Sequence, residues 1–386
     1  MNGHTKFQAE RVSRLNPYVP GEQPRDRDYI KLNANENPYP PSPAVLQAVL
    51  QTLRDNPMAT ARYPDPDSLD LKKAIASLLN RTGGVLARAV VAGGAVSPSP
   101  GDALGFEVTP EMIFCGNGSD EVLSFVFYAF FDGDRPLITL EHTYSFYPVY
   151  GLYYGIPLKA VPLTPRWQVD VSGVAEAAGA ADSGVILPNP NAPTGIALSR
   201  EEVRGLLRRC PPDRAVVIDE AYADFGGESC LGLLPEFPNL VIVRTFSKSL
   251  SGAGLRLGYA VASGELCRVL TQVKNSFNHF PLDALTQRAG IAACSDPAWY
   301  AANAAKIASE RDSLAAFLRD RGWLVLPSSA NFLFTQKPGH SGRALYGRLR
   351  DQGILVRRFD IPGIEDFLRI TVGTAAQMAA LKEALG

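Results

Sequence analysis

A single lysine lies in a segment of small hydroxylated residues and glycines, a combination that could bind an anion and form a covalent bond. The segment extends from Arg244 to Gly258 and reads RTFSKSLSGAGLRLG, with Lys248 as its lysine. A lysine amine can condense with an aldehyde, whereas hydroxyls and the guanidinium of Arg256 can hold a phosphate dianion. These groups suit the chemistry of pyridoxal 5'-phosphate (PLP). A polar turn with a surface lysine is the simpler alternative.

A second segment makes that alternative the weaker one. Residues 216–219 read Val-Val-Ile-Asp, so an apolar strand is predicted to end in an acid, and Tyr222 follows three residues after Asp219. Together the two segments resemble the PLP-dependent aminotransferases of fold type I, and within them the histidinol-phosphate aminotransferase family. The resemblance extends from about Leu15 to Thr374, with the motifs in the family's order.

The resemblance implies an α/β fold of two parts. A large domain has a mostly parallel mixed sheet sandwiched by helices, and a smaller α+β domain follows at the C-terminal end. Short, continuous apolar runs agree with this, because they are typical of strands covered on both faces; they lie at 185–187, 215–218, 240–243 and 258–262. We expect an N-terminal arm over 1–45, the large PLP-binding domain over 46–275 and the small domain over 276–386.

Two segments differ from this alternation of strands and helices. The arm contains seven prolines, which forbid a long helix and predict an extended segment that packs on the small domain and a partner subunit. Disorder is the alternative, but the run Leu32–Asn37 and the tyrosines of the arm favour an ordered one. Residues 82–105 are rich in Gly, Ala, Val, Pro and Ser and are predicted to be a mobile insertion rather than a catalytic part.

Composition narrows the classes of partner. The formal net charge of -1 gives no reason to expect nucleic acid as a partner, and no apolar run reaches the ~18–20 residues that a membrane span needs. The five cysteines are scattered, which favours reduced thiols in a cytoplasmic protein. The four histidines show no metal-ligand spacing, so we expect no metal site. Small molecules are the expected partners.

The resemblance implies the roles of three catalytic residues. The amine of Lys248 forms a Schiff base with PLP and then moves a proton, which requires a neutral amine. Asp219 holds the pyridine nitrogen protonated, so that the ring accepts electrons. Capping of the next helix is the alternative for Asp219. Tyr222 donates to the phenolic oxygen of the cofactor, with simple packing as its alternative.

Phosphate binding is distributed over two turns. Residues 116–120, Gly-Asn-Gly-Ser-Asp, join a predicted strand at 112–115 to a helix predicted over 119–131 with Ser119 or Asp120 as its N-cap. Backbone amides at a helix start suit an anion. The resemblance implies that the phosphate is bound by Gly118, Ser119, Asp120, Thr245, Ser247 and Arg256, with Asp120 acting chiefly through its backbone amide.

Two tyrosines complete the implied cofactor site. Tyr144 is similar to the aromatic residue that stacks on the pyridine ring, whereas Phe146 and Tyr147 are predicted to belong to the core. Tyr63 matches the tyrosine that reaches the cofactor phosphate of the partner subunit. The active site would then be complete only in a homodimer.

One position differs from the family pattern. The family commonly has an asparagine immediately before Pro-Thr-Gly, where this chain has Ala192 before Pro193. Either Asn191 reaches the cofactor from one position earlier, or the contact is lost and Tyr222 alone provides it. We favour Asn191.

The substrate residues are implied by resemblance as well. Arg369 matches the arginine that binds a substrate carboxylate, for which a planar bidentate donor is suited. Arg357 lies where the family places an arginine for the substrate phosphate, and Arg358 is the alternative. Tyr18 is similar to a residue that lines the same pocket, with arm packing as its alternative.

The implied function is amino transfer between glutamate and imidazole-acetol phosphate, which yields histidinol phosphate and 2-oxoglutarate in L-histidine biosynthesis by a ping-pong mechanism. Two alternatives use the same scaffold: an aminotransferase for aromatic amino acids, and an amino-acid phosphate decarboxylase. A regulator that uses the fold as a sensor would carry an added helix-turn-helix domain, whereas here a short arm precedes the fold.

Overall fold

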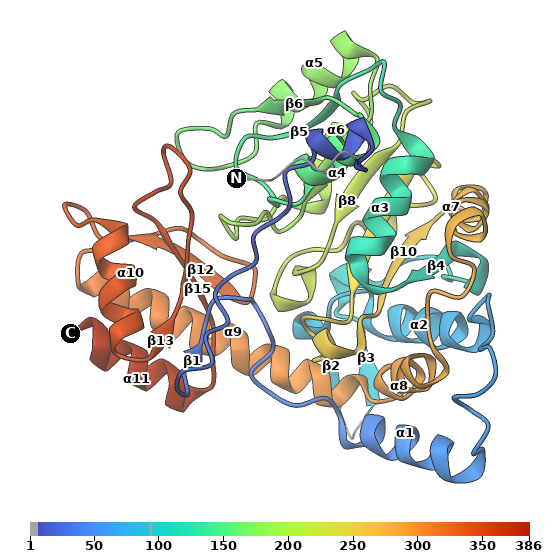
Figure 1. Ribbon diagram of the computed structural model, residues 1–386, viewed down its shortest axis with the longest axis horizontal. Coiled ribbons are helices and arrows are strands. Elements are labelled where there is room, and N and C mark those ends of the chain that lie inside the picture. Colours follow the sequence, from blue (N-terminus) through green and yellow to red (C-terminus); the bar gives the residue numbers. More distant parts are fainter. Residues whose placement is uncertain (1–6, 93–94) are drawn as a thin grey trace.

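A seven-stranded sheet forms the centre of the larger body of the computed structural model, which describes residues 7–92 and 95–386 (Figure 1). The order in the sheet is β4-β10-β9-β8-β7-β5-β6. The strands are β4 (Ile113–Gly116), β5 (Leu137–Leu140), β6 (Leu158–Val161), β7 (Val185–Pro188), β8 (Val216–Asp219), β9 (Leu240–Thr245) and β10 (Gly258–Ala262). Strand β10 is antiparallel to β4 and β9, and the remaining pairs are parallel. The predicted mostly parallel mixed sheet is confirmed.

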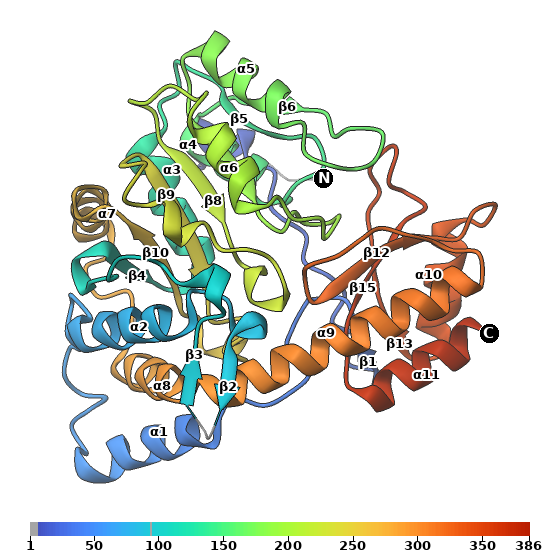
Figure 2. The same cartoon turned by 180° about the vertical axis from the view of Figure 1, so that it is seen from behind.

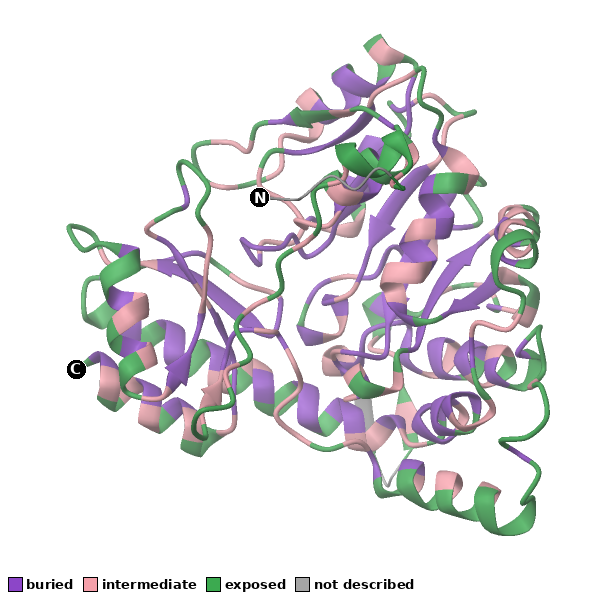
Figure 3. Ribbon diagram, in the orientation of Figure 1, coloured by how far each residue is buried: buried purple, intermediate pink, exposed green. Residues whose placement is uncertain are grey.

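Helices cover both faces of this sheet because its strands are apolar on both sides. Val217 and Val241 pack with α3 (Gly118–Phe130), α4 (Tyr147–Tyr154) and α7 (Gly264–Phe277). Ile218 and Ile242 point to the opposite face, where the core includes α2 (Leu69–Thr82), α5 (Val171–Ala181) and α6 (Arg200–Leu207). The central strands β8 and β9 are buried throughout their length (Figure 3). Helices α1 (Pro43–Asp55) and α8 (Ala284–Ser295) pack against each other beside α2.

A smaller antiparallel sheet follows in the chain and has the order β11-β12-β15-β14. Its strands are β11 (Leu324–Val325), β12 (Phe332–Gln336), β14 (Arg357–Arg358) and β15 (Leu368–Thr371). The flanking helices are α9 (Pro297–Asp320), α10 (Gly342–Asp351) and α11 (Ala375–Leu385). The predicted smaller α+β part is confirmed, while the predicted domain boundaries stay predictions. Figure 1 shows α9 running from the region of α8 to the smaller sheet.

The arm lies on the smaller part of the molecule. Strand β1 (Ile30–Lys31) pairs in parallel with β13 (Ile354–Leu355), and Glu22 forms an ion pair with Arg350 at 2.8 Å. The following residues Leu32, Asn33 and Asn35 are buried. Residues 1–6 of the predicted arm lie outside the described residues.

The segment 82–105 forms a hairpin of β2 (Val90–Ala92) and β3 (Ala95–Ser97), and β3 contacts α9 (Figure 2). Its residues 93 and 94 lie outside the described residues. Residues 82–86, which precede the hairpin, are buried. Asp102 follows the hairpin, and its buried carboxylate forms ion pairs with Arg88 at 2.8 Å and with Arg200 at 3.2 Å. These contacts fasten both ends of the segment, and its mobility stays a prediction.

Candidate functional site

Nine of the twelve predicted cofactor residues meet in one cavity of about 270 Å³ at the carboxyl ends of the central strands. Asp219 is the last residue of β8, and Thr245 is the last residue of the adjacent β9. Parallel strands end at the same edge of a sheet, so residues that follow them in sequence converge there. Nine predicted residues line the cavity: Ser119, Asp120, Tyr144, Asp219, Tyr222, Thr245, Ser247, Lys248 and Arg256.

Lys248 lies three residues beyond the end of β9. Its Nζ donates to the backbone oxygen of Ala34 at 3.2 Å and lies 5.7 Å from the ring centroid of Tyr222. Asn37 donates to the backbone oxygens of Lys248 and Ser249. The arm therefore holds the lysine segment from one side and gives its amine an acceptor.

The carboxylate of Asp219 is buried at the bottom of this site. It accepts hydrogen bonds from the Tyr147 hydroxyl at 3.1 Å and from the backbone N–H of Ala221 at 3.1 Å. Burial raises the pKa of Asp219 to about 6, against the opposing effect of these two donors. A carboxyl group in this setting gains from a cationic partner, such as a protonated ring nitrogen.

The turn that is predicted to bind phosphate lies where α3 begins. Gly118 has φ 82°, and a Cβ atom there would lie 2.7 Å from Nη2 of Arg256, so a larger side chain would fill the turn. The predicted N-cap is wrong: α3 begins at Gly118 with Asn117 as its N-cap. The Glu121 carboxylate accepts the Asn117 backbone N–H at 2.6 Å, and the Asn117 side chain forms no capping hydrogen bond to the first turn of α3.

The carboxylate of Asp120 joins two other predicted residues. It accepts from the Tyr144 hydroxyl at 2.9 Å and pairs with Arg256 at 3.3 Å. The role of its backbone amide toward phosphate stays a prediction.

Arg369 approaches the cavity from β15 of the smaller sheet. Its Nη2 donates to the backbone oxygen of Asn33 at 3.1 Å, and its buried Nε has no partner among the described residues. Phe332 and Phe359 lie within 5.6 Å of the guanidinium carbon. Burial lowers the pKa of Arg369, while the neighbouring Tyr222 acts in the opposite direction. A partly unpaired guanidinium among aromatic rings is suited to an anionic ligand.

Besides Gly118 and Arg369, four further predicted residues lie outside the cavity wall. The Asn191 amide donates to His142 O and Thr194 Oγ1, and Ala192 lines the cavity in its place. The Tyr63 ring is exposed and stacks on Phe280 at 4.5 Å. Arg357 lies beside the arm and donates to the backbone oxygen of Val19. Tyr18 lies in the arm and contacts Phe146. Arg358, the alternative to Arg357, forms an ion pair with Asp360.

Two contacts of the site were not predicted from the sequence. Tyr147 was assigned to the core, yet its hydroxyl bonds to Asp219. Asn35 donates its side-chain amide to the Tyr222 hydroxyl at 3.0 Å. The polar run Leu32–Asn37 was a signal for Asn35, because buried amides need partners. No sequence signal separates Tyr147 from the aromatic residues around it.

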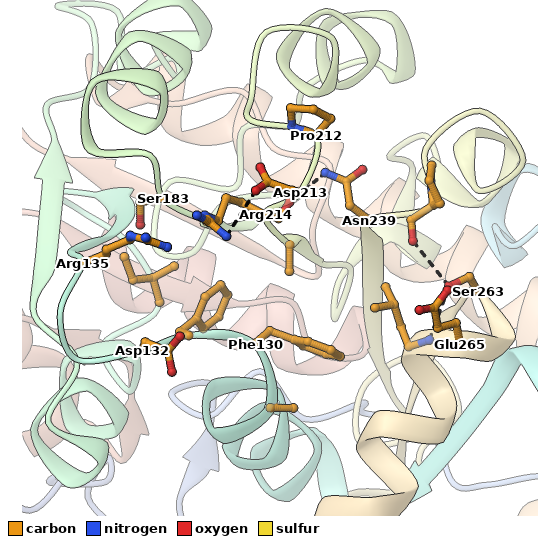
Figure 4. Close-up of a pocket in the computed structure, with 17 residues that line it drawn as sticks. Phe130, Asp132, Arg135, Ser183, Pro212, Asp213, Arg214, Asn239, Ser263 and Glu265 are labelled. Atoms are coloured by element: carbon orange, nitrogen blue, oxygen red, sulfur yellow. Dashed lines mark hydrogen bonds and ion pairs between the residues drawn. The ribbon is translucent and has the colours of Figure 1, made fainter.

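A second cavity, of about 410 Å³, opens at the opposite edge of the sheet, where β5, β7, β8 and β9 begin (Figure 4). Its charges are largely paired within the protein: Arg214 forms ion pairs with Asp182 at 2.6 Å and with Asp213 at 3.4 Å. Among the described residues that line it, none is a predicted site residue. The predicted site residues therefore gather in the first cavity and not in this one.

The groups in the first cavity fit PLP. Lys248 supplies an amine for an aldehyde, and Asp219 supplies a buried acid for a ring nitrogen. The start of α3 and Arg256 supply donors for a phosphate. Two observations match this ligand best: the close approach of the Arg256 guanidinium to the backbone at Gly118, which a side chain there would obstruct, and the burial of Asp219.

Comparisons with known proteins agree with this site. Residues 27–385 match the family model of aminotransferase class I and II. Histidinol-phosphate aminotransferase of Syntrophus aciditrophicus is 48% identical over 98% of this chain and 96% of its own. That of Chromohalobacter salexigens is 44% identical over 99% of this chain and 98% of its own. The crystal structure of histidinol-phosphate aminotransferase from Sinorhizobium meliloti in complex with pyridoxal-5'-phosphate is 27% identical, with a TM-score of 0.78 over 93% of this chain and 90% of that chain. The chain belongs to the class I and II aminotransferases, and within them to the histidinol-phosphate aminotransferases.

Proposed function

We propose that the protein transfers an amino group between glutamate and imidazole-acetol phosphate, forming histidinol phosphate and 2-oxoglutarate in L-histidine biosynthesis. The names of the similar proteins support this substrate pair. The observation that carries the chemistry is the single cavity that Lys248 and Asp219 share. We place the reaction in the cytoplasm, in keeping with the five free, buried cysteines.

Each protein group has a distinct task in this proposal. PLP, when bound, withdraws electrons from the substrate carbon. Lys248 moves a proton at that carbon through its Nζ, and Asp219 keeps the ring nitrogen protonated. Tyr222 donates to the phenolic oxygen, and Tyr144 packs on the ring. The phosphate is bound by Gly118, Ser119, Asp120, Thr245, Ser247 and Arg256.

Two arginines divide the substrates between them. Arg369 binds the carboxylate of glutamate or 2-oxoglutarate, and its unpaired, buried Nε supports this role. Arg357 binds the phosphate of histidinol phosphate. Arg357 is half-buried and donates to the backbone oxygen of Val19 in the arm. Arg357 and Tyr18 both act electrostatically on the guanidinium of Arg369.

Substrate choice is tested by comparing kcat/KM for histidinol phosphate and for phenylalanine. We expect a preference for histidinol phosphate, which Arg357→Ala should reduce by roughly 10- to 100-fold, since a charge-assisted bond to phosphate contributes about 1.5–3 kcal/mol. Arg358→Ala is the matched control and should leave the preference unchanged, because Arg358 pairs with Asp360.

Other outcomes would select an alternative. A preference for phenylalanine that survives Arg357→Ala would indicate an aromatic amino-acid aminotransferase. Release of carbon dioxide from an amino-acid phosphate, without formation of glutamate, would indicate the decarboxylase.

A homodimer completes the site in this proposal. Tyr63 is 83% exposed, and α1 adds the exposed apolar residues Leu46, Leu50 and Leu53 (Figure 3). A second copy that covers this face would remove apolar surface from water and bring Tyr63 to the partner's phosphate site. Sedimentation equilibrium should give the mass of a dimer, and a monomer with full activity would contradict this arrangement.

Tyr147 provides a test of how the protein controls Asp219. Its hydroxyl donates to the carboxylate, which favours the ionised form and lowers the pKa of Asp219. Tyr147→Phe should therefore raise that pKa and move the acidic limb of the pH profile of kcat/KM upward by about one unit. Tyr154→Phe is the control, because the Tyr154 hydroxyl bonds to Ser124 instead. An unchanged acidic limb in Tyr147→Phe would contradict the assignment.

A further inference from the structure

Three consecutive arm residues contact three different groups of the proposed active site. The backbone oxygen of Asn33 accepts from Arg369 at 3.1 Å, and that of Ala34 accepts from Lys248 at 3.2 Å. The Asn35 side chain donates to the Tyr222 hydroxyl at 3.0 Å. The segment 33–35 follows β1, which lies beside β13 in the smaller part of the molecule (Figure 1). Of the three contacts, that of Asn35 is made by a side chain and is therefore specific to its residue type.

The surroundings of Asn35 fix its conformation. It is 1% exposed and has φ 54°, a left-handed conformation that is uncommon for residues other than glycine. The Thr371 hydroxyl accepts from the Asn35 backbone N–H and donates to its Oδ1, both at 3.0 Å. Asn331 donates to its backbone oxygen at 3.0 Å. Asparagine adopts this conformation more readily than most residues other than glycine, and these three bonds hold Asn35 in one orientation.

These bonds set the direction of the Tyr222 hydroxyl. Since Thr371 occupies Oδ1, the other end of the Asn35 side chain is an amide that can only donate. The Tyr222 oxygen therefore accepts from Asn35, and its single proton is left for another acceptor. Tyr222 lines the cavity, where the phenolic oxygen of the cofactor is that acceptor in the proposed function.

We propose that Asn35 is a positioning residue, which keeps the proton of Tyr222 directed into the cavity and links it to the strand that carries Arg369. Thr371 lies on β15 two residues after Arg369, so one strand bears both the proposed carboxylate ligand and the partner of Asn35. This inference rests on the proposed function, because it concerns the donor to the cofactor.

Asn35→Asp tests the direction of the bond with almost no change of shape. A carboxylate accepts only, so it takes the proton of Tyr222 and withdraws it from the cofactor. The pKa of the lysine-bound cofactor, measured by an absorbance titration without substrate, should then rise by about one unit or more. The surrounding titratable groups are unchanged in this comparison: Lys248, Arg369, Asp219, Tyr144 and Glu36.

The added negative charge would itself raise this pKa, and a second background separates the two effects. In Tyr222→Phe, Asn35→Asp should produce only the charge effect, so the upward shift should be smaller than in the wild type. Asn33→Asp is the matched control on the same segment, since the Asn33 amide donates to Glu22 O instead of Tyr222. Its shift should be the same in both backgrounds.

Asn35→Gly protects the test against misfolding, because glycine adopts φ 54° without strain. It removes the donor without adding charge and should raise the pKa in the wild type but not in Tyr222→Phe. Equal shifts in both backgrounds, for Asn35→Asp and Asn35→Gly alike, would overturn the inference. If no lysine-bound cofactor forms in the wild type, the proposed function itself fails, which distinguishes the two results.

Discussion

Lys248→Ala should abolish covalent attachment of the cofactor and lower kcat/KM on the order of 10⁴-fold. The variant loses both the amine that binds the aldehyde and the base that moves the proton, and a positioned proton-transfer group alone contributes about 10²–10⁴-fold. After borohydride reduction, mass spectrometry of the wild type should find the cofactor on the peptide that contains Lys248. The reduced variant should carry none.

Two controls make this result specific. Lys306→Ala removes an exposed lysine that lies over the Tyr39 ring, and it should retain the adduct and the activity. A small primary amine added to Lys248→Ala should restore part of the activity, because it replaces the missing base. An adduct on another lysine, or a variant with normal turnover, would show that Lys248 is not the attachment point.

The sequence predicts the central sheet well because its strands have a simple physical signature. Strands β8 and β9 are covered on both faces, and their residues 216–218 and 240–243 are therefore apolar. A polar residue at the end of such a run stands out, as Asp219 and Thr245 do. Since parallel strands end at one edge, these residues could be expected to meet before any coordinates were known.

Contacts between distant polar residues could not be predicted in the same way. Asn35 and Tyr222 are far apart in sequence, and their bond depends on how the arm crosses the smaller sheet. Tyr147 lies within an aromatic run together with the cavity residue Tyr144 and with Phe146, which packs against the core, and only the position of α4 places its hydroxyl on Asp219. Asp102 pairs with Arg200 from another part of the chain in the same manner. Each contact follows from tertiary packing, for which the local sequence carries no periodic signal.

Asp219→Asn should lower kcat/KM by roughly 10³-fold, because an amide cannot hold a ring nitrogen in its protonated form, and loss of one positioned electrostatic partner costs about 10²–10³-fold or more. The wild type should bind PLP more tightly than this variant. Asp224→Asn is less suitable as a control, since Asp224 accepts from Ser249 beside the lysine. Asp182→Asn changes an exposed acid at the far edge of the sheet and should leave kcat/KM unchanged.

Although Asp219→Asn should lower kcat/KM, it should increase the stability of the cofactor-free protein. Burial raises the pKa of Asp219 to about 6, above its ordinary value of 3.8. The folded state therefore favours the protonated acid. The stability that the protonated form gives to the folded state is fully present below pH 3.8 and is lost as the pH rises through about 6. Above that range the buried charge lowers the free energy of unfolding by on the order of 3 kcal/mol. Asp219→Asn removes this cost. It also weakens one of the two hydrogen bonds to the side chain, which costs about 1 kcal/mol.

Cofactor-free Asp219→Asn should thus unfold at a higher urea concentration than the wild type above pH 6, by about 1–2 kcal/mol in the free energy of unfolding, and the difference should shrink as the pH falls. With PLP bound, the order should reverse, since the protonated nitrogen then pairs with the carboxylate and its binding energy adds to the stability of the wild type alone. A variant that is less stable than the wild type in both forms would mean that Asp219 is a structural residue. The reversal therefore distinguishes an acid that is retained for its cofactor from one that is retained for the fold.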